Sequence, residues 1–190
     1  MHPCHRMRTT VNQMSNVLVV YYSRTGTTRR VAAEIAALGQ WDLEPVIDMK
    51  PRNNLFGYAR SMFDSLFGRS TELAAPRHNP AEYELVIIGT PVWHGSVSAP
   101  IRTWLQDWAG RLPTFAFFAT EKRRGAERAF RQMAALAGST PIITLELTAR
   151  DVDSGPLGRR LVPLIATVRG AVGATQVAAR SPEALPPATH

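Results

Sequence analysis

The sequence predicts an α/β fold, a doubly wound three-layer sandwich in which helices cover both faces of a five-stranded parallel sheet. Five short apolar runs have the pattern of strands buried on both faces, and they lie at residues 17–22, 43–47, 85–89, 115–119 and 142–147. Segments with helical spacing of apolar residues separate these runs. Such alternation predicts strand–helix–strand units with right-handed crossovers, and therefore a parallel sheet.

The first two strands and the helix between them follow from simple patterns. Residues 17–22 (VLVVYY) are an uninterrupted apolar and aromatic run, and residues 27–38 carry apolar side chains at helical spacing before Gly39. Pro45 lies inside the second strand. Because proline cannot donate a hydrogen bond to a neighbouring strand, it predicts an edge position for this strand.

A long connection follows the second strand, and it contains a strongly amphipathic helix predicted over residues 55–67. The Phe-rich face of this helix is typical of packing against a sheet. The same face could instead form a homodimer or roof a substrate pocket.

The second half of the chain repeats the unit of strand and helix. After the strand LVIIG at residues 85–89, helices are predicted over residues 99–108, 125–136 and 157–168, around the strands at 115–119 and 142–147. These elements predict one domain over residues 17–170. We expect an N-terminal extension at residues 1–16 to be disordered, and residues 171–190 to form a C-terminal tail with a Pro-rich, disordered end.

The composition argues against several classes of protein. Cys4 is the only cysteine, so no internal disulfide and no metal site are expected. The net charge is +7, but Lys50 and Lys122 are the only lysines among 22 basic residues and the arginines are scattered, which favours an arginine-rich genome over nucleic-acid binding. No signal peptide and no membrane span are expected, and a cytoplasmic location is the simplest.

Hydroxyl side chains are concentrated directly after the first strand. The loop there consists of Ser23, Arg24, Thr25, Gly26, Thr27 and Thr28, and it leads into the first helix. Backbone N–H groups, hydroxyls and the helix dipole can together hold a phosphate at such a place. An ordinary helix cap is the alternative, although one cap does not need four hydroxyls. The motifs of a P-loop and of a dinucleotide-binding fold are both missing.

These residues resemble a known family. The segment YYSRTGTTRRVAAEIA resembles the flavodoxin signature, in which a strand leads into [ST]-x-T-G-x-T and a helix. VIIGTPVWHGSVSAPIRTWL is similar to the second flavin loop of flavodoxin-like oxidoreductases, and FAFFATEKRRGAE takes the place of the third. The resemblance covers about residues 17–147. It implies the strand order 2-1-3-4-5 and non-covalently bound flavin mononucleotide (FMN) at the carboxyl ends of the strands.

The resemblance places the contacts to FMN in three loops. They are Ser23, Arg24, Thr25, Gly26, Thr27 and Thr28 in the first loop, Thr90, Pro91, Val92, Trp93, His94 and Gly95 in the second, and Thr120, Glu121 and Gly125 in the third. No catalytic side chain is assigned, because a bound flavin carries the redox chemistry itself.

Alternatives stay open for three features of these loops. Trp93 could pack on a planar flavin ring or simply cover the end of the sheet. His94 could bond a flavin carbonyl or be an exposed loop histidine with no chemical task. The third loop lacks the aromatic residue that flavodoxins often carry there, and its basic run Lys122-Arg123-Arg124 could attract NADPH phosphate or be a solvated surface.

Three functions are compatible with the sequence. An FMN-dependent oxidoreductase would pass electrons from NAD(P)H to a quinone-like acceptor, and an electron carrier would dock redox protein partners in turn. A non-redox binding or regulatory module on the same fold is the third. Flavodoxin carriers are typically acidic, so the basic charge, the open third loop and the extra aromatic helix favour the oxidoreductase.

Overall fold

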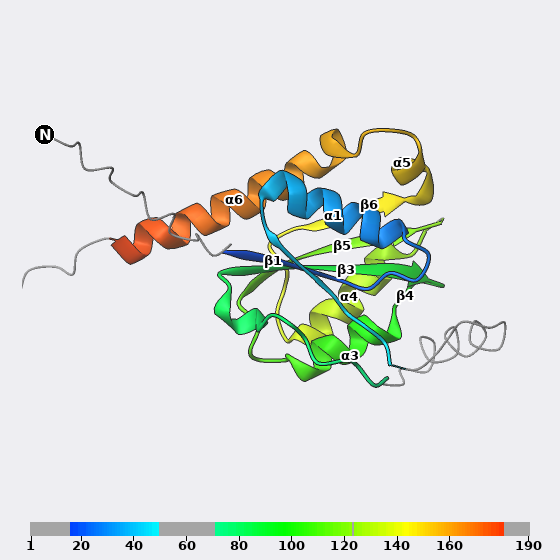
Figure 1. Cartoon of the computed structure of the whole chain (residues 1–190), viewed down its shortest axis with the longest axis horizontal. Helices are drawn as coiled ribbons and strands as arrows, with labels where there is room; N and C mark the ends of the chain where they lie inside the picture. The colour runs from blue at the N-terminus through cyan, green and yellow to red at the C-terminus, as the bar shows by residue number, and fades with distance from the viewer. Residues whose placement is uncertain (1–15, 50–70, 123, 181–190) are drawn as a thin grey trace, which may run out of the picture.

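Five parallel strands form the central sheet, in the order β2-β1-β3-β5-β6 (Figure 1). The computed structural model of the chain describes residues 16–49, 71–122 and 124–180. The strands are β1 (Val17–Tyr21), β2 (Asp42–Pro45), β3 (Leu85–Trp93), β5 (Thr114–Glu121) and β6 (Thr144–Thr148). Counted along the parallel strands this is the predicted order, and the strand that contains Pro45 does lie at the edge.

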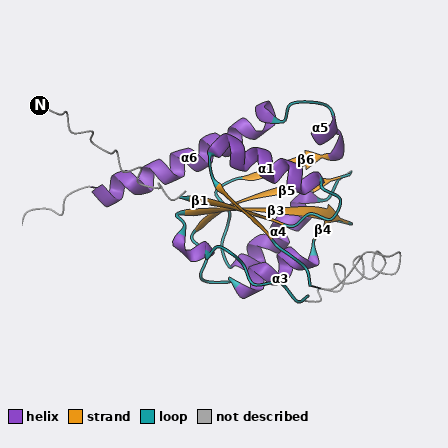
Figure 2. Ribbon diagram, in the orientation of Figure 1, coloured by secondary structure: helices purple, strands orange, loops and turns teal. Residues whose placement is uncertain are grey.

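Helices cover both faces of the sheet, as Figure 2 shows. They are α1 (Thr27–Gly39), α3 (Ala99–Asp107), α4 (Ala126–Ala137), α5 (Ala149–Asp153) and α6 (Gly158–Arg180), with a short 3-10 helix η1 (Pro80–Glu82) before β3. Alternate residues of β1 point to opposite faces. Val19 joins a core with α1 and α6, and Leu18 joins a second core with α3 and α4. The three-layer sandwich is therefore confirmed.

The third strand is longer than predicted. Its expected end at Gly89 is wrong, because β3 continues to Trp93 and then turns back through β4 (Ser96–Val97). This hairpin is antiparallel, with Val92 opposite Val97. Residues 90–93 were predicted to belong to the second flavin loop, yet Pro91 pairs in register with Thr120 of β5.

The last helix also differs from the prediction. It was expected over residues 157–168, but α6 runs to Arg180 and projects past the end of the sheet (Figure 1). Ala171 and Val172 pack against the core beside α1, and the Arg169 guanidinium donates a hydrogen bond to the Leu38 carbonyl at 2.8 Å. These contacts continue the helix beyond the expected boundary.

Some expectations fall on other parts of the chain. The amphipathic helix predicted at residues 55–67 lies outside the described residues, and so do residues 1–15 of the predicted extension at 1–16 and residues 181–190 of the predicted tail. Within the described ranges, no helix is long and apolar enough to cross a membrane.

Candidate functional site

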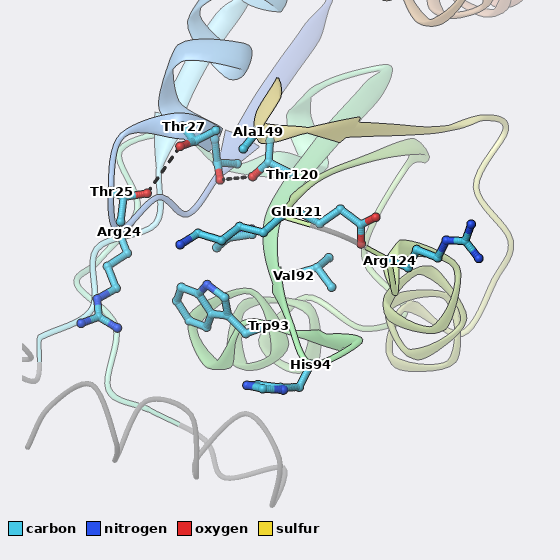
Figure 3. Close-up of a pocket in the computed structure, with 13 residues that line it drawn as sticks. Arg24, Thr25, Thr27, Val92, Trp93, His94, Thr120, Glu121, Arg124 and Ala149 are labelled. Carbon is cyan, nitrogen blue, oxygen red and sulfur yellow. Dashed lines mark hydrogen bonds between the residues drawn. The ribbon is translucent and has the colours of Figure 1, made fainter. Parts of the chain in front are cut away.

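A cavity of about 610 Å³ opens at the carboxyl ends of β1, β3 and β5. In the sheet, β2 lies on one side of β1 and β3 lies on the other, so the strand order reverses at β1. Open α/β sheets bind ligands at such a point. The volume suits a small organic ligand. Figure 3 shows the lining residues, which are Arg24, Thr25, Thr27, Thr28, Pro91, Val92, Trp93, His94, Thr120, Glu121, Lys122, Arg124 and Ala149.

The first predicted loop forms one wall of the cavity. Gly26 begins α1 with a φ of +95°, a left-handed conformation that glycine adopts without strain, and its N–H donates to the Ser23 hydroxyl at 3.1 Å. Thr25 and Thr27 line the cavity, with their hydroxyl oxygens 3.5 Å apart (Figure 3). The first N–H groups of any helix lack partners within the helix. This wall therefore offers hydroxyls and N–H groups to an anion.

Thr28 has a different surrounding from the other loop hydroxyls. It is almost fully buried, and its hydroxyl hydrogen-bonds the Thr120 hydroxyl at 2.7 Å. This bond joins the start of α1 to the end of β5 across the cavity floor. Thr28 thus holds the two walls together, and the hydroxyls that face the cavity more openly are those of Thr25 and Thr27.

The second predicted loop is the β3–β4 hairpin. Trp93 ends β3 half-buried, with its ring edge-on to Tyr22 at a centroid distance of 6.5 Å. The Arg24 guanidinium carbon lies 6.0 Å from the centroid of the Trp93 ring. His94 is exposed at the turn with a φ of +52°. The Trp93 ring therefore borders the cavity between the first loop and the hairpin turn.

Several predicted contact residues shape these loops and do not line the cavity. Thr90 is fully buried, and its hydroxyl accepts a hydrogen bond from the Ser98 N–H at 3.2 Å, which fixes β3 to the start of α3. Gly95 and Gly125 meet backbone to backbone: a Cβ on Gly125 would lie 2.7 Å from the Gly95 Cα. Ser23 and Gly26 set the turn of the first loop. The contact between the two glycines sets the spacing of the second and third loops.

The third predicted loop begins inside the sheet, because β5 continues through Thr120 to Glu121. Glu121 is 5% exposed, and one of its carboxyl oxygens accepts a hydrogen bond from the Ala126 N–H at 3.0 Å, at the start of α4. Lys122 and Arg124 are exposed and line the cavity, while residue 123 lies outside the described residues. Glu121, Lys122 and Arg124 thus form the third-loop wall of the cavity, where flavodoxins often carry an aromatic residue.

Comparison with known families and structures decides the family. A sequence model of the family described as flavodoxin matches residues 16–147, which is more than half of the chain. The chain belongs to the flavodoxin family. Comparison with curated protein sequences gives no match.

Solved structures with the flavodoxin fold resemble this one. A flavoprotein in complex with FMN from Lactobacillus acidophilus aligns with a TM-score of 0.61 at 22% identity, over 74% of this chain and 97% of that one. A flavodoxin, WrbA-like protein from Agrobacterium tumefaciens aligns with a TM-score of 0.51 at 18% identity, over 85% and 98%. An NADH:FMN oxidoreductase in its apo form aligns with a TM-score of 0.50 at 15% identity, over 82% and 87%. At these identities the likeness shows the fold.

Three lining residues were not among the predicted flavodoxin contacts. Ala149 follows β6 and begins α5, and its place directly after the last strand is the signal that would have pointed to it. Lys122 and Arg124 stand in the third loop, where only their neighbours were assigned. No group of three or more potential metal ligands occurs in the part of the chain that the structure describes.

Among the residues that line this flavodoxin cavity, Glu121 has an unusually high pKa. Burial of the carboxyl and, after it, the neighbouring Glu146 carboxyl raise the pKa of Glu121 to about 7, although the bond from the Ala126 N–H acts in the opposite direction. Burial favours the neutral acid because it removes water from the charged form. Glu121 therefore changes its charge near neutral pH.

Replacing Glu121 with glutamine tests this ionisation in the protein without ligand. A raised pKa means that the contribution of Glu121 to stability is complete below the unfolded value of 4.5 and is lost as the pH rises to about 7. We expect Glu121→Gln to unfold about 3 °C or more above the wild type at pH 8, with the difference shrinking toward pH 4.5. Thermal unfolding followed by circular dichroism measures this; a difference that does not vary with pH would contradict it.

Proposed function

We propose that this protein binds FMN in the cavity and acts as an oxidoreductase that passes electrons from NAD(P)H to a quinone-like acceptor. The observation that carries the proposal is the pairing of two walls in one cavity. Thr25 and Thr27 stand with the N-terminus of α1 on one side, and Trp93 stands on the other. A ligand with a phosphate and a planar ring matches this pair of walls.

The residues present fit the two ends of FMN. The α1 wall offers hydroxyls, N–H groups and the positive end of a helix dipole, which suit a phosphate. The half-buried Trp93 offers an aromatic surface, and Val92 and Pro91 add apolar contacts beside it. The FMN complex of the Lactobacillus acidophilus flavoprotein, which shares this fold, supports the choice of ligand.

Bound FMN would supply the acceptance and release of electrons, and the residues of the chain would hold and orient it. Thr25, Thr27 and the α1 N-terminus would fix the phosphate. Trp93 would limit the movement of the ring. The bond between Thr28 and Thr120 would hold the start of α1 against the end of β5 beside the ligand.

The choice of NAD(P)H as donor rests on charge. Lys122 and Arg124 are exposed and line the cavity, and Arg24 lines it beside Trp93. Positive groups around an opening attract anionic ligands and raise their rate of association. A nicotinamide dinucleotide is such an anion. The fold shared with an NADH:FMN oxidoreductase also supports a reductase.

An anaerobic stopped-flow experiment tests the proposed function. The purified protein is loaded with FMN and mixed with NADH or with NADPH, and the absorbance of the oxidised flavin is followed. We expect rapid bleaching, followed by reoxidation when a quinone is added. Bleaching only with a chemical reductant or with a separate reductase protein would instead indicate an electron carrier. Absence of any bound flavin would refute both functions.

Replacing Trp93 with alanine should weaken FMN and riboflavin by the same factor, about tenfold. Loss of an aromatic contact removes about 1 to 1.5 kcal/mol, and this contact concerns the ring that both ligands share. Quenching of flavin fluorescence measures both dissociation constants. Trp108→Ala is the matched control, because Trp108 stacks with Arg111 and does not line the cavity. An unchanged affinity in Trp93→Ala would assign Trp93 to covering the sheet.

A further inference from the structure

Positive side chains outnumber negative ones on the walls of the cavity. Arg24, Lys122 and Arg124 line it, and Glu121 is the only acidic residue among the lining residues that the structure describes. Glu121 is 5% exposed, and its carboxyl already accepts a hydrogen bond from the Ala126 N–H. A ligand in the cavity therefore lies in a positive electrostatic field, whatever its orientation.

The Arg24 guanidinium lies at the Trp93 end of the cavity. Arg24 belongs to the first loop and directly precedes Thr25, but its guanidinium carbon is 6.0 Å from the centroid of the Trp93 ring. Figure 3 shows the two side chains next to each other. A guanidinium is attracted to the face of an aromatic ring at this distance. The charge of Arg24 is therefore held beside the wall that we assign to the flavin ring.

Lys122 brings a second positive charge to the cavity from the end of β5. It directly follows Glu121, is exposed and lines the cavity. Within the ranges that the structure describes, its ammonium group has no hydrogen bond or ion pair. Arg124 differs, because Figure 3 shows its side chain extending beyond Glu121, away from Trp93. Arg24 and Lys122 are therefore the cations whose charge a bound ring would feel most.

The charge of a flavin ring depends on its oxidation state. A hydride from NAD(P)H carries two electrons and one proton, so its transfer oxidises the nicotinamide and adds one negative charge to the uncharged flavin ring. The phosphate of FMN is the same in both states. Positive groups near the ring therefore favour the reduced form, because they attract the added charge.

We propose that Arg24 and Lys122 make the cavity bind reduced FMN more tightly than oxidised FMN, and so raise the reduction potential of FMN on binding. This inference rests on the proposed function and deepens it, because FMN with a raised potential accepts a hydride from NAD(P)H more readily. One charge near a partly solvated ligand changes its affinity by a few-fold. Two such charges should favour the reduced form about tenfold.

The midpoint potential of bound FMN tests the inference. It is measured at pH 7.5 by anaerobic reduction with dithionite in the presence of a reference dye, and compared with that of free FMN. We expect the bound value to be about 30 mV higher, which is a tenfold preference converted for two electrons. Arg24→Gln and Lys122→Gln should each reduce the preference about threefold, which lowers the potential by about 14 mV. High salt should reduce the difference, because it screens exposed charges.

Arg111→Gln is the matched control for Arg24→Gln. Both variants remove one guanidinium from above a tryptophan ring, because the Arg111 guanidinium carbon lies 4.5 Å from the centroid of the Trp108 ring. Arg111 does not line the cavity, so its variant should keep the potential of the wild type. Lys122→Arg keeps the positive charge and should also keep the potential. Circular dichroism shows whether each variant is folded.

Each outcome decides the inference. A raised potential that falls in Arg24→Gln and Lys122→Gln, and not in Arg111→Gln, supports it. A potential at or below that of free FMN overturns it, and so does an equal fall in Arg111→Gln, which would indicate an effect of net charge alone. An equal loss of affinity for both forms of FMN, with an unchanged potential, would place the cations at the phosphate and overturn it too. These three results leave the proposed function standing, whereas failure of the wild type to bind FMN would refute that function and this inference with it.

Discussion

Alanine in place of Gly125 should lower the free energy of unfolding by about 3 kcal/mol and the melting temperature by roughly 10 °C. Two costs combine at this position. Gly125 has a φ of +137°, where an L-residue is strained, and its Cβ would lie 2.7 Å from the Gly95 Cα and 3.0 Å from the Gly95 nitrogen. Backbone atoms cannot rotate away as a flexible side chain can. The hairpin and the start of α4 must therefore separate.

The same substitution should weaken flavin binding, because the contact between Gly95 and Gly125 sets the spacing of the second and third loops, which both line the cavity. The matched control is Gly138→Ala at the other end of α4. Gly138 also has a positive φ, +75°, but a Cβ there meets nothing within 4 Å. It should cost only backbone strain, about 1 kcal/mol, and leave binding unchanged. Equal losses in the two variants would show that strain alone matters and that the two loops do not need their close approach.

Apolar runs predicted the fold because the three central strands, β1, β3 and β5, are buried on both faces, so nearly every residue in them is apolar. Residues such as Leu18 and Val19 belong to opposite cores, yet both are apolar, as a parallel sheet between helical layers requires. The strand β4 has only two residues, which is too short for an alternating apolar pattern to predict it from the sequence. The end of α6 was missed because its continuation depends on Ala171 and Val172 packing against α1, a contact between distant segments.

In the site, the local sequence identified the loops but not the task of each residue. In the sequence, Thr25 and Thr28 are both threonines of one hydroxyl-rich loop, and nothing nearby distinguishes their roles. Only the fold places Thr28 against Thr120, 92 residues away. Glu121 likewise has no local sign of its burial, which depends on α4 and on Glu146 from the next strand. Pairings across the sheet thus separate residues that shape the cavity from residues that face it.

Removal of the ligand phosphate should have the largest effect on binding. We expect FMN to bind at least about 100-fold more tightly than riboflavin at pH 7.5, since hydrogen bonds from the two threonine hydroxyls and from the α1 N–H groups together contribute about 3 kcal/mol. Thr25→Ala combined with Thr27→Ala should reduce this ratio to about tenfold, because both hydroxyls line the α1 wall. The backbone N–H groups would remain. Parallel fluorescence titrations with the two ligands measure the ratio.

Thr28→Val tests whether the Thr28 hydroxyl stabilises the fold or binds the ligand. Valine matches the shape of threonine, but it leaves the buried Thr120 hydroxyl without its partner at 2.7 Å. An unpaired buried polar group costs about 1 to 3 kcal/mol, so Thr28→Val should lower stability. It should change FMN and riboflavin affinities by similar factors, unlike the double variant at Thr25 and Thr27. If Thr28→Val lowered the ratio as strongly as the double variant, Thr28 itself would be a phosphate ligand, and the bond to Thr120 would have to break on binding.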